Sequence, residues 1–246
     1  MVMISLLSLP LDLPPDAPAR EGGLTTFVDQ LPEYLGRCQS FEGGLSGSPQ
    51  MTEAHGGYLD LPSLLSWMSS RQHAPEGGYS GRTNKLVDGC YSHWVGAAWT
   101  FIEAALRQPP EAGALTPGSV DEGLYSKEGL IRYVLSCCQA DSGEGGLRDK
   151  PNTGPDGYHT CYALAGFSYA QHSSTFDDAA QSSSANGLAA PFGWVPTSRP
   201  ADQGNERSTE PAYDIEDTLQ PLHPIYVIPW HAVEQTRAFY SAKVGF

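Results

Sequence analysis

A carboxylate and a thiol, those of Asp88 and Cys90, are separated by a single glycine at the start of an apolar helical segment. Both side chains can point to one site, where they would be a hard and a soft ligand of the same Zn²⁺ ion. Arg82 and Lys85 lie three residues apart, so in a helical or turn backbone they share a face, as the binding of an anion requires. The alternative is an N-capping aspartate, a buried cysteine and two solvated cations. An isolated Asp-x-Cys motif does not decide between these two interpretations.

The elements that carry these residues are predicted to be helices. Apolar residues recur at helical spacing, as at Leu61, Leu64 and Met68, and no stretch alternates apolar and polar residues over more than a few positions. The sequence therefore predicts an all-α fold. The apolar residues 1–9 lack a basic segment and are followed by Pro10, so they predict the end of a core helix rather than a signal peptide. The other predicted helices cover residues 24–39, 61–73, 90–107, about 130–138, 158–172 and 231–243.

One pattern occurs three times: a helix ends in glutamine, and Glu-Gly-Gly with an aromatic residue or leucine follows, which indicates internal repeats. The glutamates of these turns are Glu42, Glu76 and Glu144, which lie 34 and then 68 residues apart. The first interval has room for one helix and the second for two. A spacing of 34 residues also suits a tetratricopeptide array, but the repeated turns are Glu-Gly-Gly and nothing near residue 110 repeats them.

The composition is globular and acidic. With 14 basic and 28 acidic residues among 246, the chain has a net charge of −14 and a pI near 4.7, which argues against a nucleic-acid or anionic-membrane surface. Any anion site must therefore be a local basic pocket. No apolar run approaches the ~18 residues that a membrane span needs, so membrane insertion is not expected and any lipid would be a substrate. Five scattered cysteines suit no disulfide framework and favour a reducing, cytoplasmic location.

Residues 173–218 differ in composition from the rest of the chain. They are rich in Ser, Ala, Gly, Pro and Asp, with few large apolar residues outside Phe192–Val195. Such a segment cannot bury enough surface to offset its chain entropy, so it predicts a flexible, low-complexity insertion. The expected organisation is a helical domain over residues 1–172, this insertion, and a closing C-terminal helix over residues 219–246.

The segment from Gly81 to Trp94 resembles the signature of the β subunits of protein prenyltransferases, and Leu86–Cys90 is most similar to the farnesyltransferase branch. The resemblance implies a toroid of helical hairpins, with inner helices around a central cavity. In that pattern an inner helix is missing after Tyr58, and the chain starts partway through. We therefore expect an incomplete α/α toroid, from a truncated gene product or isoform with an internal skip. Further similar motifs follow in the family's order: Glu53-Ala54-His55-Gly56-Gly57-Tyr58, Leu147-Arg148-Asp149-Lys150-Pro151, Tyr158-His159-Thr160-Cys161-Tyr162 and Leu219-Gln220-Pro221-Leu222-His223-Pro224.

The chemistry that this resemblance implies is transfer of a farnesyl group from farnesyl diphosphate to the cysteine of a C-terminal CaaX motif in a protein. By the resemblance, Asp88, Cys90 and His159 are the ligands of a catalytic Zn²⁺, and the fourth position stays open for the substrate sulfur. Spacing alone does not single out His159 among seven histidines. Departure of the diphosphate needs cations and hydrogen-bond donors, and Lys85 and Tyr91 are expected to serve as catalytic groups there.

The resemblance also assigns substrate contacts. Asp149 matches an acid that is associated with Mg²⁺ on the diphosphate, although a salt bridge from Asp149 to Lys150 or Arg148 is the alternative. His93 departs from the family, in which an aromatic residue, usually phenylalanine, is more common. The remaining expected contacts are His55, Arg82, Lys85 and Tyr91 with the diphosphate, Tyr58, Trp94 and Tyr162 with the isoprenoid, and Tyr158 with the peptide.

Two functions remain open from the sequence. One is the β subunit of a farnesyltransferase, which works as a heterodimer with an α subunit. The other is a non-catalytic remnant that at most binds the α subunit. The expected metal ligands favour the enzyme, whereas the missing helices favour the remnant.

Overall fold

The computed structural model describes residues 6, 11–40, 44–46, 48–49, 61–107, 123–140, 143, 145–177, 193–198 and 213–243. These residues are mostly helical, as predicted, and none of their helices is long and apolar enough to cross a bilayer. The elements in chain order are η1 (Pro18–Arg20), α2 (Leu31–Cys38), α3 (Leu61–Ser69), α4 (Tyr91–Trp94), α5 (Gly96–Arg107), α6 (Lys127–Tyr133), the π-helix η2 (Val134–Cys138), α7 (Gly157–Gln171), β1 (His172–Phe176), β2 (Trp194–Ser198), η4 (Ile215–Asp217) and α9 (Trp230–Ser241).

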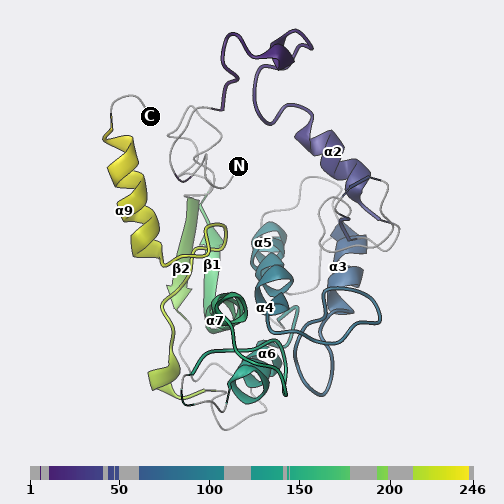
Figure 1. Cartoon of the computed structure of the whole chain (residues 1–246), viewed down its shortest axis with the longest axis vertical. Coiled ribbons are helices and arrows are strands. Elements are labelled where there is room, and N and C mark those ends of the chain that lie inside the picture. Colours follow the sequence, from purple (N-terminus) through teal and green to yellow (C-terminus); the bar gives the residue numbers. More distant parts are fainter. Residues whose placement is uncertain are drawn as a thin grey trace.

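Helix α7 is the central element of the described part. It packs against α4, α5, α6 and β1, and Figure 1 shows it between the strand pair and the α4–α5 segment. Its contact with α4 is close, because a Cβ added at Gly166 would lie 2.2 Å from the side chain of Ser92. Helices α2 and α9 lie away from this group in Figure 1. The close contact between α4 and α7 matters for function, because the expected metal ligands lie at the start of these two helices.

An apolar core holds α3, α5, α6 and η2 together. Met68, Tyr79, Trp99, Leu130 and Val134 come from different parts of the chain and are each at most 1% exposed. Burial of a large apolar side chain stabilises a fold by about 1.5–3 kcal/mol, so this cluster is a main source of stability. The loops that leave the core are thereby held in place.

The three repeated turns have the same backbone pairing, which confirms the internal repeats. In each, the glutamine after the helix forms an antiparallel bridge with the residue that follows the two glycines. The bridges are Gln39 to Leu45, Gln72 to Tyr79 and Gln139 to Leu147. The accompanying hydrogen bonds are Ser46 N to Cys38 O at 2.9 Å, Ser80 N to Arg71 O at 2.9 Å and Arg148 N to Cys138 O at 2.8 Å. Gly77 in the second turn has φ +82°, and a Cβ there would lie 2.2 Å from the carbonyl oxygen of Gly129, so only glycine suits it.

Three sequence predictions about the elements are wrong in detail. The helix predicted over residues 61–73 ends at Ser69. Helix α2 begins at Leu31 rather than at residue 24, because the Asp29 carboxylate accepts hydrogen bonds from the backbone N–H groups of Thr25 and Thr26, at 2.6 and 3.0 Å, and holds a turn there. The predicted helix over residues 90–107 is divided into α4 and α5 at Val95.

Strands, which the sequence did not predict, are present within the segment expected to be an insertion. β1 and β2 pair antiparallel, from His172 opposite Ser198 to Phe176 opposite Trp194. The pair is anchored by Trp194, which is 7% exposed and whose ring lies 5.2 Å from that of Phe101 on α5. The local sequence of β1 does not indicate a strand by itself, and tertiary packing on α5 stabilises the strand pair instead.

Candidate metal centre

The loop before α4 positions Asp88 and Cys90 through backbone hydrogen bonds on either side of Gly89. Asp88 N donates to Tyr79 O at 3.0 Å, and Gly89 N donates to Asp149 O at 2.7 Å. A Cβ added at Gly89 would lie 2.9 Å from both the Arg148 carbonyl oxygen and the Cys138 sulfur. The glycine between the two candidate ligands is thus required by close packing.

His159 is held by Asp156, a residue that the sequence reasoning missed. Asp156 caps α7: its Oδ1 accepts from His159 N at 2.7 Å, and its Oδ2 lies 2.6 Å from His159 Nδ1. The hydrogen bonds from the His159 backbone and then from its ring lower the pKa of Asp156, so the carboxylate is ionised at neutral pH. Because an ionised carboxylate can only accept, His159 Nδ1 carries a proton, which leaves Nε2 as the ring nitrogen that could bind a metal ion.

His159 Nε2 faces Asp88 and Cys90. The ligand atoms of the three residues all lie within 4.8 Å of one another, and Nε2 is 3.5 Å from Asp88 Oδ1. Two ligands about 2 Å from one tetrahedral metal ion would be roughly 3.3 Å apart, so the spacing is suitable. These three residues, which the sequence singled out, could therefore hold a metal ion.

The Cys90 thiol is protonated in this environment without a cation. Burial, followed by the hydrogen bond and the charge of Asp88, raises the pKa of Cys90 to about 12. Asp88 Oδ1 also accepts from Cys90 N at 2.8 Å. The N-cap of α4 is Cys90 and not Asp88, so the N-capping role considered for Asp88 is wrong. A bound cation would favour the thiolate that metal coordination needs.

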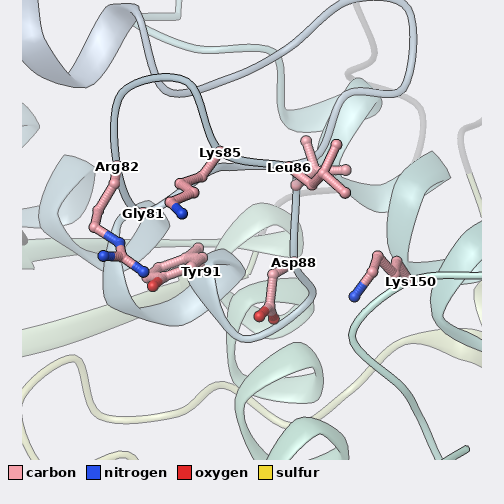
Figure 2. A pocket seen from close by; sticks show the side chains of 8 residues that line it. Gly81, Arg82, Lys85, Leu86, Asp88, Tyr91 and Lys150 are labelled. Atoms are coloured by element: carbon pink, nitrogen blue, oxygen red, sulfur yellow. The ribbon is translucent and has the colours of Figure 1, made fainter. Parts of the chain in front are cut away.

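An open pocket of about 240 Å³ adjoins this cluster and shares Asp88 with it. Figure 2 shows Arg82 and Lys85 with Tyr91 on one side, and Lys150 on the other with its ammonium directed toward Asp88. The full lining is Gly81, Arg82, Lys85, Leu86, Val87, Asp88, Tyr91 and Lys150. Three cations against one carboxylate make this a local basic pocket in an acidic protein, as the composition requires of any anion site. Arg82, Lys85 and Tyr91 were expected together, whereas Lys150 was not assigned to the site.

Asp149 lies beside this pocket and pairs with Lys150. Its carboxylate contacts the Lys150 ammonium and the Thr153 hydroxyl. Although burial raises the pKa of Asp149, these hydrogen bonds outweigh it and leave the pKa below its usual value. Arg148, the other partner considered, instead donates to Cys137 O at 3.2 Å. The association of Asp149 with Mg²⁺ stays a prediction.

A partly exposed aromatic wall stands next to His159. Trp94 is 46% exposed and Tyr158 is 50% exposed, and Trp94 Nε1 donates to the Tyr158 hydroxyl at 3.0 Å. The Tyr162 ring lies 4.6 Å from that of Trp94 and 4.8 Å from that of Tyr158. Helices α4 and α7 thus bring these expected substrate contacts together. His55 and Tyr58, the remaining expected contacts, lie outside the described residues.

His93 is buried behind this wall. Its ring stacks on that of Tyr162 at 5.1 Å, and it is 7% exposed. Burial lowers the pKa of His93 to about 4, so the ring is neutral at physiological pH. Its Nδ1 has no hydrogen-bond partner among the described residues.

Comparison with known proteins shows the family to which the chain belongs. The family model described as the prenyltransferase alpha-alpha toroid domain matches residues 3–59 and 58–228. The chain therefore belongs to the prenyltransferase α/α-toroid family, and its fold is an incomplete α/α toroid. The two matches meet at residues 58–59, where the sequence predicts a skip.

The relatives point to one branch of that family. The chain is 42% identical over 271 aligned residues to the protein farnesyltransferase subunit beta of Pyricularia oryzae, covering all of this chain and 48% of the relative. It is 36% identical over 234 residues to the subunit of the same name in Schizosaccharomyces pombe, covering 86% and 51%. The geranylgeranyl transferase type-1 subunit beta of Arabidopsis thaliana is 30% identical over 162 residues, covering 55% and 37%. The chain spans about half the length of the first two relatives.

Proposed function

We propose that the chain forms part of the β subunit of a protein farnesyltransferase, in which Asp88, Cys90 and His159 bind Zn²⁺. Three protein ligands with an open fourth position are typical of catalytic zinc sites. The Asp156–His159 hydrogen bond supports this role, since histidines that bind metal usually donate their other ring N–H to a carboxylate.

The observation that carries the proposal is that Asp88 belongs both to the candidate metal cluster and to the wall of the basic pocket. When bound, Zn²⁺ would supply the positive charge that stabilises the thiolate of a CaaX cysteine. Arg82, Lys85 and Tyr91 would hold the diphosphate of farnesyl diphosphate and stabilise it as it leaves. The thiolate, as nucleophile, and the diphosphate, as leaving group, would then lie on opposite sides of the reacting carbon atom of the isoprenoid.

The aromatic wall suits the rest of the substrates. Trp94, which is 46% exposed, offers a ring face for an isoprenoid, with the half-buried ring of Tyr162 beside it, and the exposed Tyr158 would contact the peptide. The proposal includes an α subunit as partner in a heterodimer, and a cytoplasmic location. Neither nucleic acid nor membrane insertion has a part in it.

Zinc content tests the metal site. The full-length protein that contains this sequence is purified with its α subunit, and bound metal is measured by atomic emission. One Zn²⁺ per heterodimer is expected for the wild type and for Cys161→Ser, an exposed cysteine on the same helix as His159. Cys38→Ser, which removes a buried thiol far from the cluster in sequence, should also keep its zinc. Cys90→Ser should lose it, and equal zinc in all four proteins would refute the assignment.

One observation favours the second function, a chain that at most binds an α subunit. The family match is divided at residues 58–59, and an inner helix missing there would open the substrate cavity to water. The test is co-expression of the 246-residue chain with an α subunit, beside a version that carries a helix of about 16 residues after Tyr58. Farnesyl transfer by the restored chain but not by the 246-residue chain would favour the non-catalytic function for the chain as it stands. Equal transfer by both would favour the enzyme.

A further inference from the structure

Lys150 and Asp149 form an ion pair at the edge of the basic pocket. The Lys150 ammonium contacts Asp149 Oδ2, and the Thr153 hydroxyl lies at hydrogen-bond distance from Asp149 Oδ1. Both oxygens of the Asp149 carboxylate therefore have a partner within the chain. The ammonium occupies the position from which a metal cation would contact Oδ2. A divalent cation that binds this carboxylate oxygen would therefore have to displace the ammonium.

Lys150 also faces the space in the basic pocket where an anion would bind. It is a lining residue together with Arg82 and Lys85, and its ammonium is directed toward Asp88 (Figure 2). The Lys150 side chain is 37% exposed, so water screens its pair with Asp149 and the pair is weak. A lysine has a flexible four-carbon stem with rotatable donors. The ammonium can thus leave Asp149 for an anion in the pocket without a movement of the backbone.

The repeats give Lys150 the same place in its loop as Arg82 has in the preceding one. Each lies three residues after the residue that bridges to the glutamine of its turn. Two residues further on, Asn84 and Asn152 both have a left-handed backbone, with φ 58° and 70°. The two loops therefore correspond in position, and both supply cations to the same pocket, Arg82 and Lys85 from the first and Lys150 from the second.

We propose that Lys150 exchanges between two partners: it pairs with Asp149 in the empty site and moves to the diphosphate of a bound isoprenoid diphosphate when a divalent cation binds Asp149. This inference rests on the proposed function. An ammonium and a divalent cation on one carboxylate oxygen repel each other, so only one of them can hold Oδ2. The released ammonium joins Arg82 and Lys85 around the anion. Lys150 thereby sets how much Mg²⁺ the protein requires.

The test is equilibrium binding of farnesyl diphosphate, without a peptide substrate, to the zinc-loaded full-length heterodimer over a range of Mg²⁺ concentrations. Isothermal titration calorimetry gives the Kd at each concentration. In Lys150→Ala the Kd at saturating Mg²⁺ should rise about tenfold, because the charged contact that the released ammonium makes with the diphosphate is lost. The Mg²⁺ concentration at half effect should fall about threefold, because the competing, partly exposed ion pair is gone. Lys150→Gln, which keeps most of the stem, should behave in the same way.

Three further variants separate exchange from a simple loss of charge. Arg82→Ala should raise the Kd with and without Mg²⁺ and leave the Mg²⁺ midpoint nearly unchanged. Lys243→Ala, two residues after the end of α9, should change neither. Asp149→Asn should lose the Mg²⁺ response and bind farnesyl diphosphate more tightly than the wild type without Mg²⁺. That gain should vanish when Lys150→Ala is added.

An unchanged Mg²⁺ midpoint in both Lys150 variants, with zinc content and farnesyl diphosphate binding retained, would overturn the exchange and leave the proposed function standing. A wild-type protein that binds neither zinc nor farnesyl diphosphate would instead overturn the proposed function, and the exchange with it.

Discussion

Replacing His93 by phenylalanine exchanges one flat ring for another of similar size and removes a buried polar atom. The ring packs among Tyr162, Trp94 and Tyr169, with centroid separations of 5.1, 4.9 and 5.8 Å. Phenylalanine can keep these contacts. Because His93 Nδ1 has no partner among the described residues, the substitution relieves an unsatisfied buried group, which should raise the free energy of unfolding at neutral pH by about 1–3 kcal/mol.

The same burial makes stability depend on pH. The pKa of His93 falls from 6.5 to about 4 on folding, so between these values the unfolded chain binds more protons than the folded chain. Stability is therefore full above the unfolded pKa and is lost as the pH falls toward the folded one. The shift of the His93 pKa corresponds to a total loss of roughly 3 kcal/mol, of which about 2 kcal/mol is reached by pH 5.

Urea unfolding of the full-length heterodimer near pH 7.5 and near pH 5, with a chelator present to remove metal linkage, measures this contribution. Wild type should lose about 2 kcal/mol more than His93→Phe between the two pH values. His231→Phe on α9, an exposed histidine, should follow the wild type. If the curves of wild type and His93→Phe run parallel, then His93 does not titrate between these pH values and its predicted burial as a neutral ring is incorrect.

Further predictions concern the metal centre and the pocket. In Asp156→Asn the N–H₂ group of the amide would face either the ring or the backbone N–H of His159. Zinc affinity, measured by competition with a chelator, should therefore fall about 10–100-fold. The control Ser126→Ala removes the equivalent cap of α6, so it should cost about 1 kcal/mol of stability and leave zinc affinity unchanged. Gly89→Ala should lower both zinc content and the melting temperature, since its Cβ would lie 2.9 Å from two neighbouring atoms. Arg82→Ala should weaken farnesyl diphosphate binding by about 1.5–3 kcal/mol, and so should Lys85→Ala, with farnesol binding unchanged in calorimetry; equal diphosphate affinity in wild type and both variants would make these residues part of the solvated surface.

The repeated turns were the most predictable part of the fold. The glycine pair begins four, five and six residues after the glutamine in the three turns, and each glutamine nevertheless forms the same kind of bridge. The start of α2 was less predictable, because the apolar spacing extends back to Phe27 while the Asp29 carboxylate stabilises a turn there. The strand pair could not be predicted locally, because it depends on the packing of Trp194 against α5.

The same distinction between local and tertiary signals applies to the candidate metal centre. Asp88 and Cys90 are close in sequence, so their common direction follows from spacing and from the glycine between them. His159 comes from another helix, and only the resemblance to a family selected it. Lys150 adjoins Asp149 in sequence, but its place in the pocket depends on the hydrogen bond from Gly89 to the Asp149 carbonyl oxygen, which joins two loops. Tertiary contacts of this kind leave no signal in a single sequence.

One signal was nevertheless present, and it explains how the centre is built. The pattern Asn-x-x-x-Asp-Gly occurs at residues 84–89 and again at 152–157. Both aspartates accept a backbone hydrogen bond near the start of the following helix: Asp88 accepts from Cys90 N at 2.8 Å, and Asp156, the N-cap of α7, accepts from His159 N at 2.7 Å. Adjacent repeats therefore deliver the same carboxylate to the same place in the backbone. In the first loop the side chain of Asp88 is a candidate metal ligand, and in the second loop the side chain of Asp156 orients the candidate ligand His159. One repeated loop thus supplies both a candidate ligand and the group that orients another.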